Sequence, residues 1–228
     1  MWFRALLSLS LAASAAGGMQ DALALEKAGH DDEALAALDA IIREAPAWEL
    51  PRMEAGRLRL KLGRELERAT LDLDIARAIA PENPRAHYLF GLAREEATAD
   101  FEAMAAYRAA LALRPGYDEA RLRLAGVLFA CGRLAEAEAE YRDLARRRPD
   151  WTQARLQWAV TLEQIGRVDE AEKALMDLRA AEPGSKLFLR KLAELYERMG
   201  RTEDAAKIRR ELEPTPARKL RPLKKSRR

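Results

Sequence analysis

The side chains that most often take part in catalysis or metal binding are few in this chain and lie far apart. Apart from carboxylates, its candidate metal ligands are His30, His87 and Cys131. A zinc site usually pairs such ligands within a few residues of one another, and this spacing is absent from the sequence. His30 follows a turn glycine and is interpreted as solvated, and His87 is interpreted as a packed or surface residue. We therefore expect no metal site and no cofactor.

Cys131 is the single cysteine of the chain, which excludes a disulfide within one molecule. It falls at the end of a predicted helix, where it is interpreted as a small apolar filler. The alternative is a thiol that joins two molecules in an oxidising compartment.

Nucleophilic and acid–base catalysis are not indicated either. Carboxylates are plentiful, but they recur at helical spacings that are typical of solvated helix faces, as in Glu136, Glu138 and Glu140. No glycine-rich phosphate loop is present. No serine falls beside a histidine in a predicted rigid element. The serines are Ser8, Ser10, Ser14, Ser185 and Ser226. We expect no catalytic residue and a protein that is not an enzyme.

Composition predicts an all-α protein. Hydrophobic residues make up 49% and charged residues 34% of the 228 positions, a balance typical of chains with a buried core. Alanine, leucine, glutamate and arginine dominate, and all four favour helices. No segment alternates apolar and polar residues with β-branched enrichment, so strands are not expected.

A repeat of 34 residues organises most of the sequence. Three residue types keep this step together, which makes the periodicity specific. The turn glycines in phase are Gly132, Gly166 and Gly200. The prolines in phase are Pro115, Pro149 and Pro183, and the alanines are Ala103, Ala137, Ala171 and Ala205. Each unit is predicted to hold two helices, as over residues 117–131 and 134–148, with the glycine at the turn between them.

This pattern resembles the tetratricopeptide (TPR) repeat family over residues 16–213. The resemblance implies a solenoid of helix–turn–helix units, a right-handed superhelix in which the first helix of each unit, helix A, lines a concave face. About six units are expected, near residues 15–48, 49–83, 84–117, 118–151, 152–185 and 186–213.

Some positions depart from the repeat. Gly63 to Pro81 is one residue longer than Gly132 to Pro149, which predicts a bulge or a longer turn in the second unit. Thr98 stands where the third unit would have its turn glycine. Aromatic residues follow three of the inter-repeat prolines and are predicted to fill the junction to the next unit. They are Trp48, Tyr117 and Trp151.

The TPR resemblance also implies a binding surface. Partners of TPR proteins usually contact helix A positions that recur with the repeat, and the corresponding side chains here mix apolar, arginine and glutamine residues. This mixture suits a peptide or a partner helix. The expected contact residues are Arg85, Tyr88, Leu92, Glu95, Leu122, Arg123, Phe129, Gln153, Gln157, Val160, Glu163, Arg190, Lys191 and Glu194. Capture of a chaperone's C-terminal carboxylates is not expected, because that subtype uses paired asparagines and this chain has only Asn83.

The first residues are typical of an export signal. Arg4 precedes a short apolar stretch, and small residues follow it at Ala13, Ser14 and Ala15. We expect residues 1–15 to be a signal peptide cleaved near Ala15, and the protein to be exported, most simply to a bacterial periplasm, without a transmembrane anchor. The alternative interpretation makes this stretch an apolar first helix of a protein that stays in the cytoplasm.

Residues 214–228 are expected to form a disordered basic tail on a mildly acidic body. Its basic residues are Arg218, Lys219, Arg221, Lys224, Lys225, Arg227 and Arg228. Such a tail favours anionic lipid, lipopolysaccharide or an acidic partner. Nucleic acid is a less favoured ligand, because no aromatic residue lies beyond Tyr196 to stack on bases.

Two function classes follow from these features. The first is a non-catalytic scaffold of the bacterial cell envelope that binds another protein in its groove. The alternative is a cytoplasmic adaptor that docks on nucleic acid or another anionic surface through its tail. A subunit that positions a catalytic partner, and self-association through an end unit, also stay open.

Overall fold

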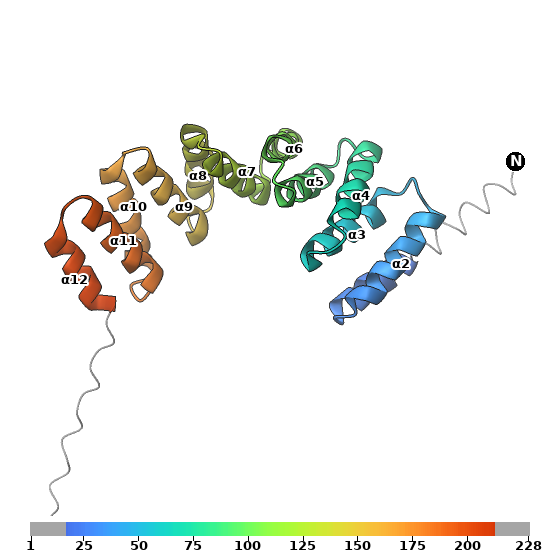
Figure 1. Cartoon of the computed structure of the whole chain (residues 1–228), viewed down its shortest axis with the longest axis horizontal. Coiled ribbons are helices and arrows are strands. Elements are labelled where there is room, and N and C mark those ends of the chain that lie inside the picture. Colours follow the sequence, from blue (N-terminus) through green and yellow to red (C-terminus); the bar gives the residue numbers. More distant parts are fainter. Residues whose placement is uncertain (1–16, 213–228) are drawn as a thin grey trace, which may run out of the picture. The chain divides into compact units, whose positions relative to one another are not determined.

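The computed structural model describes residues 17–212, and every regular element within that range is helical (Figure 1). The predicted all-α repeat fold is therefore confirmed. Residues 17–27 are helical as well. The labelled helices are α2 (Asp31–Glu44), α3 (Glu49–Leu62), α4 (Leu66–Ile79), α5 (Pro84–Glu96), α6 (Asp100–Leu113), α7 (Asp118–Ala130), α8 (Leu134–Arg147), α9 (Thr152–Gln164), α10 (Val168–Ala181), α11 (Lys186–Arg198) and α12 (Thr202–Leu212). The expected signal peptide, residues 1–15, and the expected tail, residues 214–228, lie outside the described residues.

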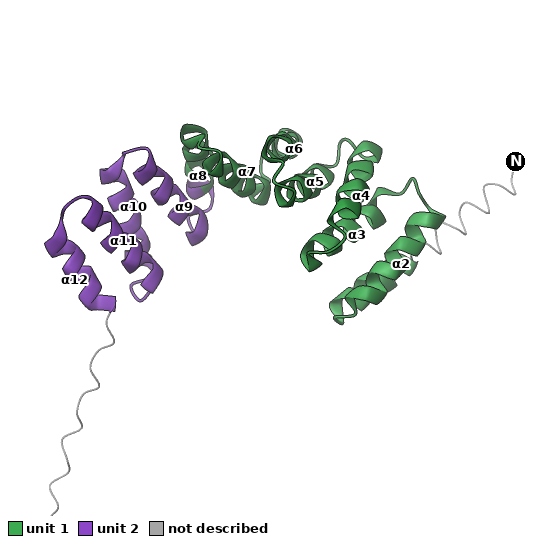
Figure 2. Ribbon diagram, in the orientation of Figure 1, with its two compact units in different colours: residues 1–144 green, residues 145–228 purple. Residues whose placement is uncertain are grey.

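The chain divides into two compact units, residues 1–144 and residues 145–228, and the division falls inside α8 (Figure 2). In unit 1, α3 packs on α4 and α5 packs on α6, and α3 also contacts α5. In unit 2, α9 packs on α10 and α11 packs on α12. Each unit is thus built from helical hairpins whose neighbours share a core. Among residues 17–212, no helix is both long enough and apolar enough to cross a membrane.

The turns between paired helices follow one design. Gly132 has a left-handed φ of 74°, its amide donates to the carbonyl of Phe129, and the next amide donates to Leu128. Thr98 takes the same place in the preceding repeat, with φ of 54°. Its amide donates to Glu95 in the same pattern. The substitution seen in the sequence therefore leaves the turn unchanged and places a β-branched residue in a conformation that it disfavours.

The extra residue of the second repeat, between Gly63 and Pro81, lies in the turn between its two helices. Helix α4 begins three residues after Gly63, whereas α10 begins two residues after Gly166. The turn accommodates the added residue with a second left-handed position, because Glu65 has φ of 49°. The predicted longer turn is confirmed.

Small residues let the paired helices approach closely. The in-phase alanines are buried, with Ala103, Ala137 and Ala171 fully enclosed. Gly56 shows the same requirement on helix A, since a β-carbon there would lie 2.5 Å from Cγ of Leu73. Larger side chains at these positions would force the helices apart.

The predicted junction aromatics pack near the starts of their A helices. Trp48 is partly buried against the core of the first repeat. Tyr117 is buried beside Ala110 and Ala120, which come from α6 and α7. For these two residues the predicted role is confirmed.

A contact that the sequence patterns did not predict ties four of the inter-repeat prolines to the helix that follows. A basic side chain six residues after the proline donates to the proline carbonyl, with donor–oxygen distances between 2.8 and 3.4 Å. This bond adds to the backbone hydrogen bonds at the entry into helix A, such as those from Trp48 to Ala45 and from Tyr117 to Arg114. The pairs are Arg52 with Pro46, His87 with Pro81, Arg121 with Pro115, and Arg155 with Pro149.

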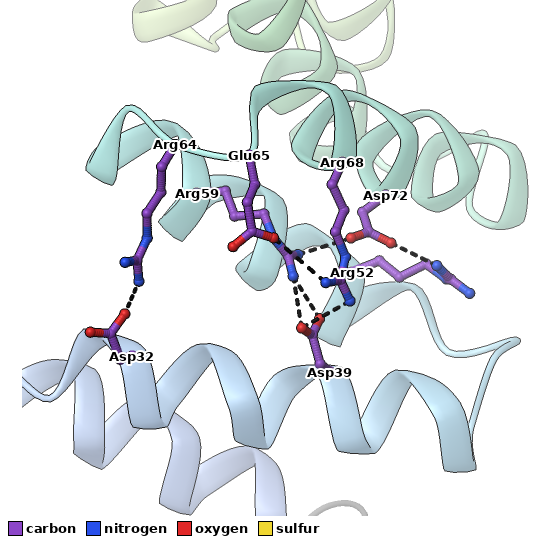
Figure 3. A network of polar contacts seen from close by, with 8 residues as sticks. All are labelled: Asp32, Asp39, Arg52, Arg59, Arg64, Glu65, Arg68 and Asp72. Atoms are coloured by element: carbon purple, nitrogen blue, oxygen red, sulfur yellow. Dashed lines mark hydrogen bonds and ion pairs between the residues drawn. The ribbon is translucent and has the colours of Figure 1, made fainter.

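A buried charge network holds the first helices of unit 1 together (Figure 3). The side chain of Arg59, on α3, is 1% exposed. It donates to both carboxylate oxygens of Asp39 on α2, at 2.7 and 2.8 Å, and to Asp72 on α4, at 3.0 Å. Arg52 completes the pairing of Asp72 at 2.8 Å. Burial raises the pKa of Asp72, and the two guanidiniums offset part of that rise.

Candidate functional site

The fourteen expected contact residues lie on α5, α7, α9 and α11, and none of them is buried. Their side chains are therefore available at the surface of each unit. Whether they contact a partner stays a prediction.

In unit 1 the structure brings three of these residues together around a tyrosine cluster. The ring of Tyr88 lies 5.0 Å from that of Tyr117 and 6.0 Å from that of Tyr107, between centroids. The hydroxyl of Tyr107 donates to Oε2 of Glu95 at 2.5 Å, and Nη1 of Arg123 lies 3.3 Å from Oε1 of the same carboxylate. Tyr107 and Tyr117 were not among the expected contact residues. Tyr117 was assigned to the inter-repeat junction, and Tyr107 only keeps the 34-residue step with Tyr141.

The electrostatics of this cluster keep the tyrosine hydroxyls protonated and leave Arg123 able to donate further hydrogen bonds. Burial raises the pKa of Tyr107, and the hydrogen bond to Glu95 raises it further, so the hydroxyl stays a donor. Burial also raises the pKa of Tyr117 to about 12. Arg123 is half exposed, so its guanidinium has donors left for a ligand after pairing with Glu95.

Other expected contact residues are joined within the chain. Arg85 reaches across to Glu54 on α3 at 2.6 Å. In unit 2, Lys191 pairs with Glu194 at 2.8 Å. Glu163 pairs there with Arg198 at 2.6 Å, and burial raises the pKa of Glu163. These pairs give the helix A surface a mixed charge rather than one sign.

A cavity of about 610 Å³ lies on another side of unit 1, where α4 and α6 flank α5. Its floor holds Phe90, and the guanidinium carbon of Arg77 lies 4.3 Å from the centroid of that ring. The lining residues are Glu67, Thr70, Leu71, Asp74, Arg77, His87, Phe90, Arg94, Glu102, Ala105, Ala106 and Ala109. None of them belongs to the expected contact set.

The two surfaces share helix α5 but use opposite faces of it. The expected contacts on α5 are Arg85, Tyr88, Leu92 and Glu95, and the cavity residues are His87, Phe90 and Arg94. At about 100° per residue, the mean directions of these sets differ by roughly 150° around the helix axis. A ligand on one face therefore does not compete directly with a ligand on the other.

Metal and thiol chemistry find little support in residues 17–212. No cluster of histidine, cysteine, aspartate and glutamate side chains there could hold a metal ion. Cys131 is exposed, and its Sγ lies 3.4 Å from Oδ2 of Asp100. Partial desolvation of the sulfur and the neighbouring carboxylate of Asp100 raise the pKa of the thiol, which disfavours the reactive thiolate.

Comparison with known proteins agrees with this architecture. Two models of the tetratricopeptide repeat match residues 102–159 and 156–218. No curated protein matches the chain in sequence.

Solved TPR structures share the fold. The TPR protein YrrB, described as having an unusual peptide-binding site, is 21% identical to this chain. The match covers 77% of this chain and 90% of YrrB, with a TM-score of 0.67. A tetratricopeptide repeat protein from Parabacteroides merdae ATCC 43184 is 20% identical over 89% of this chain and 81% of its own, with a TM-score of 0.74. The MamA protein is 21% identical over 74% of this chain and 92% of its own, with a TM-score of 0.68.

The 34-residue step, the paired helices with left-handed turns, the family models and the shared fold agree with one another. The chain belongs to the tetratricopeptide repeat family.

Proposed function

We propose that this protein is a non-catalytic scaffold of the bacterial cell envelope that binds a peptide or a partner helix on its helix A face. The observation that carries the proposal is the cluster of Tyr88, Glu95 and Arg123 in unit 1. Tyrosine and arginine are the side chains most often found at the energetic centre of protein interfaces. Here they are held by Tyr107 and Glu95 before any partner arrives, which lowers the entropy lost on binding.

The envelope location rests on the sequence of the first residues and is compatible with the folded core. Met19 and Ala22 are buried in the first repeat. Cleavage after Ala15 would leave both residues in the mature chain, so export and folding make no conflicting demands on this segment.

A paired substitution tests the binding surface. Arg123→Glu places a second carboxylate beside Glu95, and it should release partners that co-purify with the tagged protein from the envelope fraction of its host. Arg108→Glu is the matched control, because Arg108 is similarly exposed but lies on helix α6. If both variants retain the same partners in the same amounts, binding through the Tyr88 cluster is wrong.

The mass of the mature N-terminus tests export. A chain that begins at Ala16 or Gly17 and is recovered outside the inner membrane supports the envelope proposal. A chain that begins at Met1 and stays in the cytosol contradicts it. RNA would then be the first ligand to test against the basic tail.

We also propose that the tail binds anionic lipid or lipopolysaccharide through its seven basic side chains. Deleting residues 217–228 should abolish sedimentation with vesicles that contain anionic lipid, and added salt should weaken sedimentation of the full chain. Equal sedimentation of both proteins would contradict this part of the proposal.

A further inference from the structure

The cavity between α4 and α6 has walls with the periodicity of a helix-binding groove. On α4 the lining includes Glu67, Thr70, Leu71 and Asp74, and on α6 it includes Glu102, Ala105, Ala106 and Ala109. Both sets follow the spacing i, i+3, i+4, i+7, so each wall presents one stripe of a helix over two turns. The floor residues of α5 come from one face of a third helix. Two ridges separated by a groove are the surface against which a further helix packs.

One outward position of the second helices carries exposed apolar side chains throughout the repeats compared in unit 1. Leu71 is 58% exposed, and Ala105 and Ala139 are exposed at the same place in the next two repeats. At the same 34-residue step, unit 2 carries Lys173 and Lys207. A solvated surface needs no apolar residues at these positions, and the lysines of unit 2 show that the repeat accepts charge there. Of these apolar positions, Leu71 and Ala105 line the groove, and Leu71 exposes apolar surface there that a bound molecule would cover.

The charges around the groove are nearly balanced, with an acidic excess. Arg77 pairs with Asp74 at 2.6 Å, and Arg94 pairs with Glu102 at 3.3 Å. Both guanidiniums also lie over the ring of Phe90, at 4.3 and 5.9 Å from its centroid. Glu67 has no ion-pair partner within residues 17–212 and stands at the exposed edge of the groove.

We propose that this groove binds an amphipathic α-helix of a partner protein, with an apolar stripe facing Leu71, Ala105 and Phe90 and a lysine or arginine facing Glu67. The small side chains of α6 let the incoming helix backbone approach closely. The unpaired carboxylate selects a basic flank over an acidic one. This site goes beyond the proposed function and does not depend on it, because the two surfaces use opposite faces of α5.

A displayed peptide library identifies what the groove selects. The immobilised full-length protein is offered helical segments about four turns long, randomised along one stripe and its flanks. Two variants then serve to locate the binding. Ala105→Trp fills the groove with an indole, and Ala139→Trp places the same indole on α8, at a position that is also exposed but does not line the cavity. Circular dichroism verifies that both variants fold.

Selected peptides should carry apolar residues every three or four positions with lysine or arginine beside them, and Ala105→Trp should weaken their binding at least about tenfold. Ala139→Trp and Arg123→Glu should leave it unchanged, and Glu67→Lys should weaken peptides with basic flanks. The proposal is overturned if Ala105→Trp binds the selected peptides as well as the wild type does. Enrichment of proline-rich or acidic sequences, or no enrichment at all, also overturns it. Because Arg123→Glu reports on the other face, failure of the groove and failure of the proposed function are separate results.

Discussion

Gly91 and Tyr107 are packed so closely that a β-carbon on the glycine would lie 2.5 Å from Cε1 of the tyrosine ring. The ring belongs to α6 and lies across α5 at the glycine. Its hydroxyl then reaches Glu95, one turn further along α5. The missing side chain of Gly91 is therefore what lets a buried tyrosine of the second helix orient a carboxylate on the helix A surface.

Replacing Gly91 with alanine should destabilise the protein and disturb the Tyr88 cluster. The new methyl group meets a ring carbon closer than any ordinary contact, so either the ring or the helix pair must move, at a cost of about 1–3 kcal/mol. Chemical denaturation followed by circular dichroism measures this change in the free energy of unfolding.

Gly126→Ala is the control for this substitution, because the nearest atom to its added β-carbon would be the Tyr141 hydroxyl oxygen at 3.7 Å. That variant should be neutral or more stable by roughly 0.5–1 kcal/mol, since alanine favours the helix interior. Equal effects of the two substitutions would contradict the role given to the Gly91–Tyr107 contact.

Thr98→Gly should stabilise the protein by about 1 kcal/mol, because it relieves a β-branched residue with φ of 54°. The reciprocal change, Gly132→Thr, introduces the same strain into the next repeat and should destabilise by a similar amount. Both are measured by thermal and urea unfolding. A loss of stability in Thr98→Gly would show that the threonine side chain contributes contacts that outweigh its backbone strain.

Acid should weaken the first repeat through Glu26. A hydrogen bond from Arg57 lowers the pKa of this carboxyl below its ordinary value of 4.5, against an opposing effect of burial. A lowered folded pKa means that the stabilisation is present above pH 4.5 and is lost as the pH falls through the folded value. Glu26→Gln should therefore lie furthest below the wild type in stability near neutral pH, and the gap should narrow below pH 4.5.

Urea denaturation at a series of pH values measures that gap. Glu44→Gln, a change of the same kind at an exposed position on α2, should show no comparable narrowing. A constant difference between Glu26→Gln and wild type across the acidic range would contradict the assignment.

The repeat architecture could be predicted from the sequence because turn and packing residues are local signals. Gly132 marks a left-handed turn wherever it recurs, and the extra residue between Gly63 and Pro81 was visible as a break in the step. Thr98 could be placed in a glycine-type turn for the same reason. Such features depend on backbone conformation within a few residues, which the residue type specifies directly.

The groove between α4 and α6 could not be predicted in this way. Leu71 and Ala105 are unremarkable in a helical pattern, and only the packing of α5 between their helices turns them into walls. The family resemblance predicted binding on the other face of α5. The sequence did contain one signal for the groove. The outward position that holds Leu71 and Ala105 in unit 1 holds lysine in unit 2.

The burial of Arg59 could not be predicted from the helical pattern of the sequence. Arg59 occupies a helix A core position, but a charged residue is normally assigned to solvent. Its partners Asp39 and Asp72 lie on two other helices. Arg59→Met keeps the bulk and removes the charge that both carboxylates face. The loss should be about 3 kcal/mol, the lower end for breaking a buried pair, because other arginines still contact each aspartate. Arg209→Met removes an exposed partner of Glu197 and should cost less than about 1 kcal/mol. Urea unfolding of the two variants measures the difference, and similar losses would mean that the buried network contributes no more than a surface ion pair.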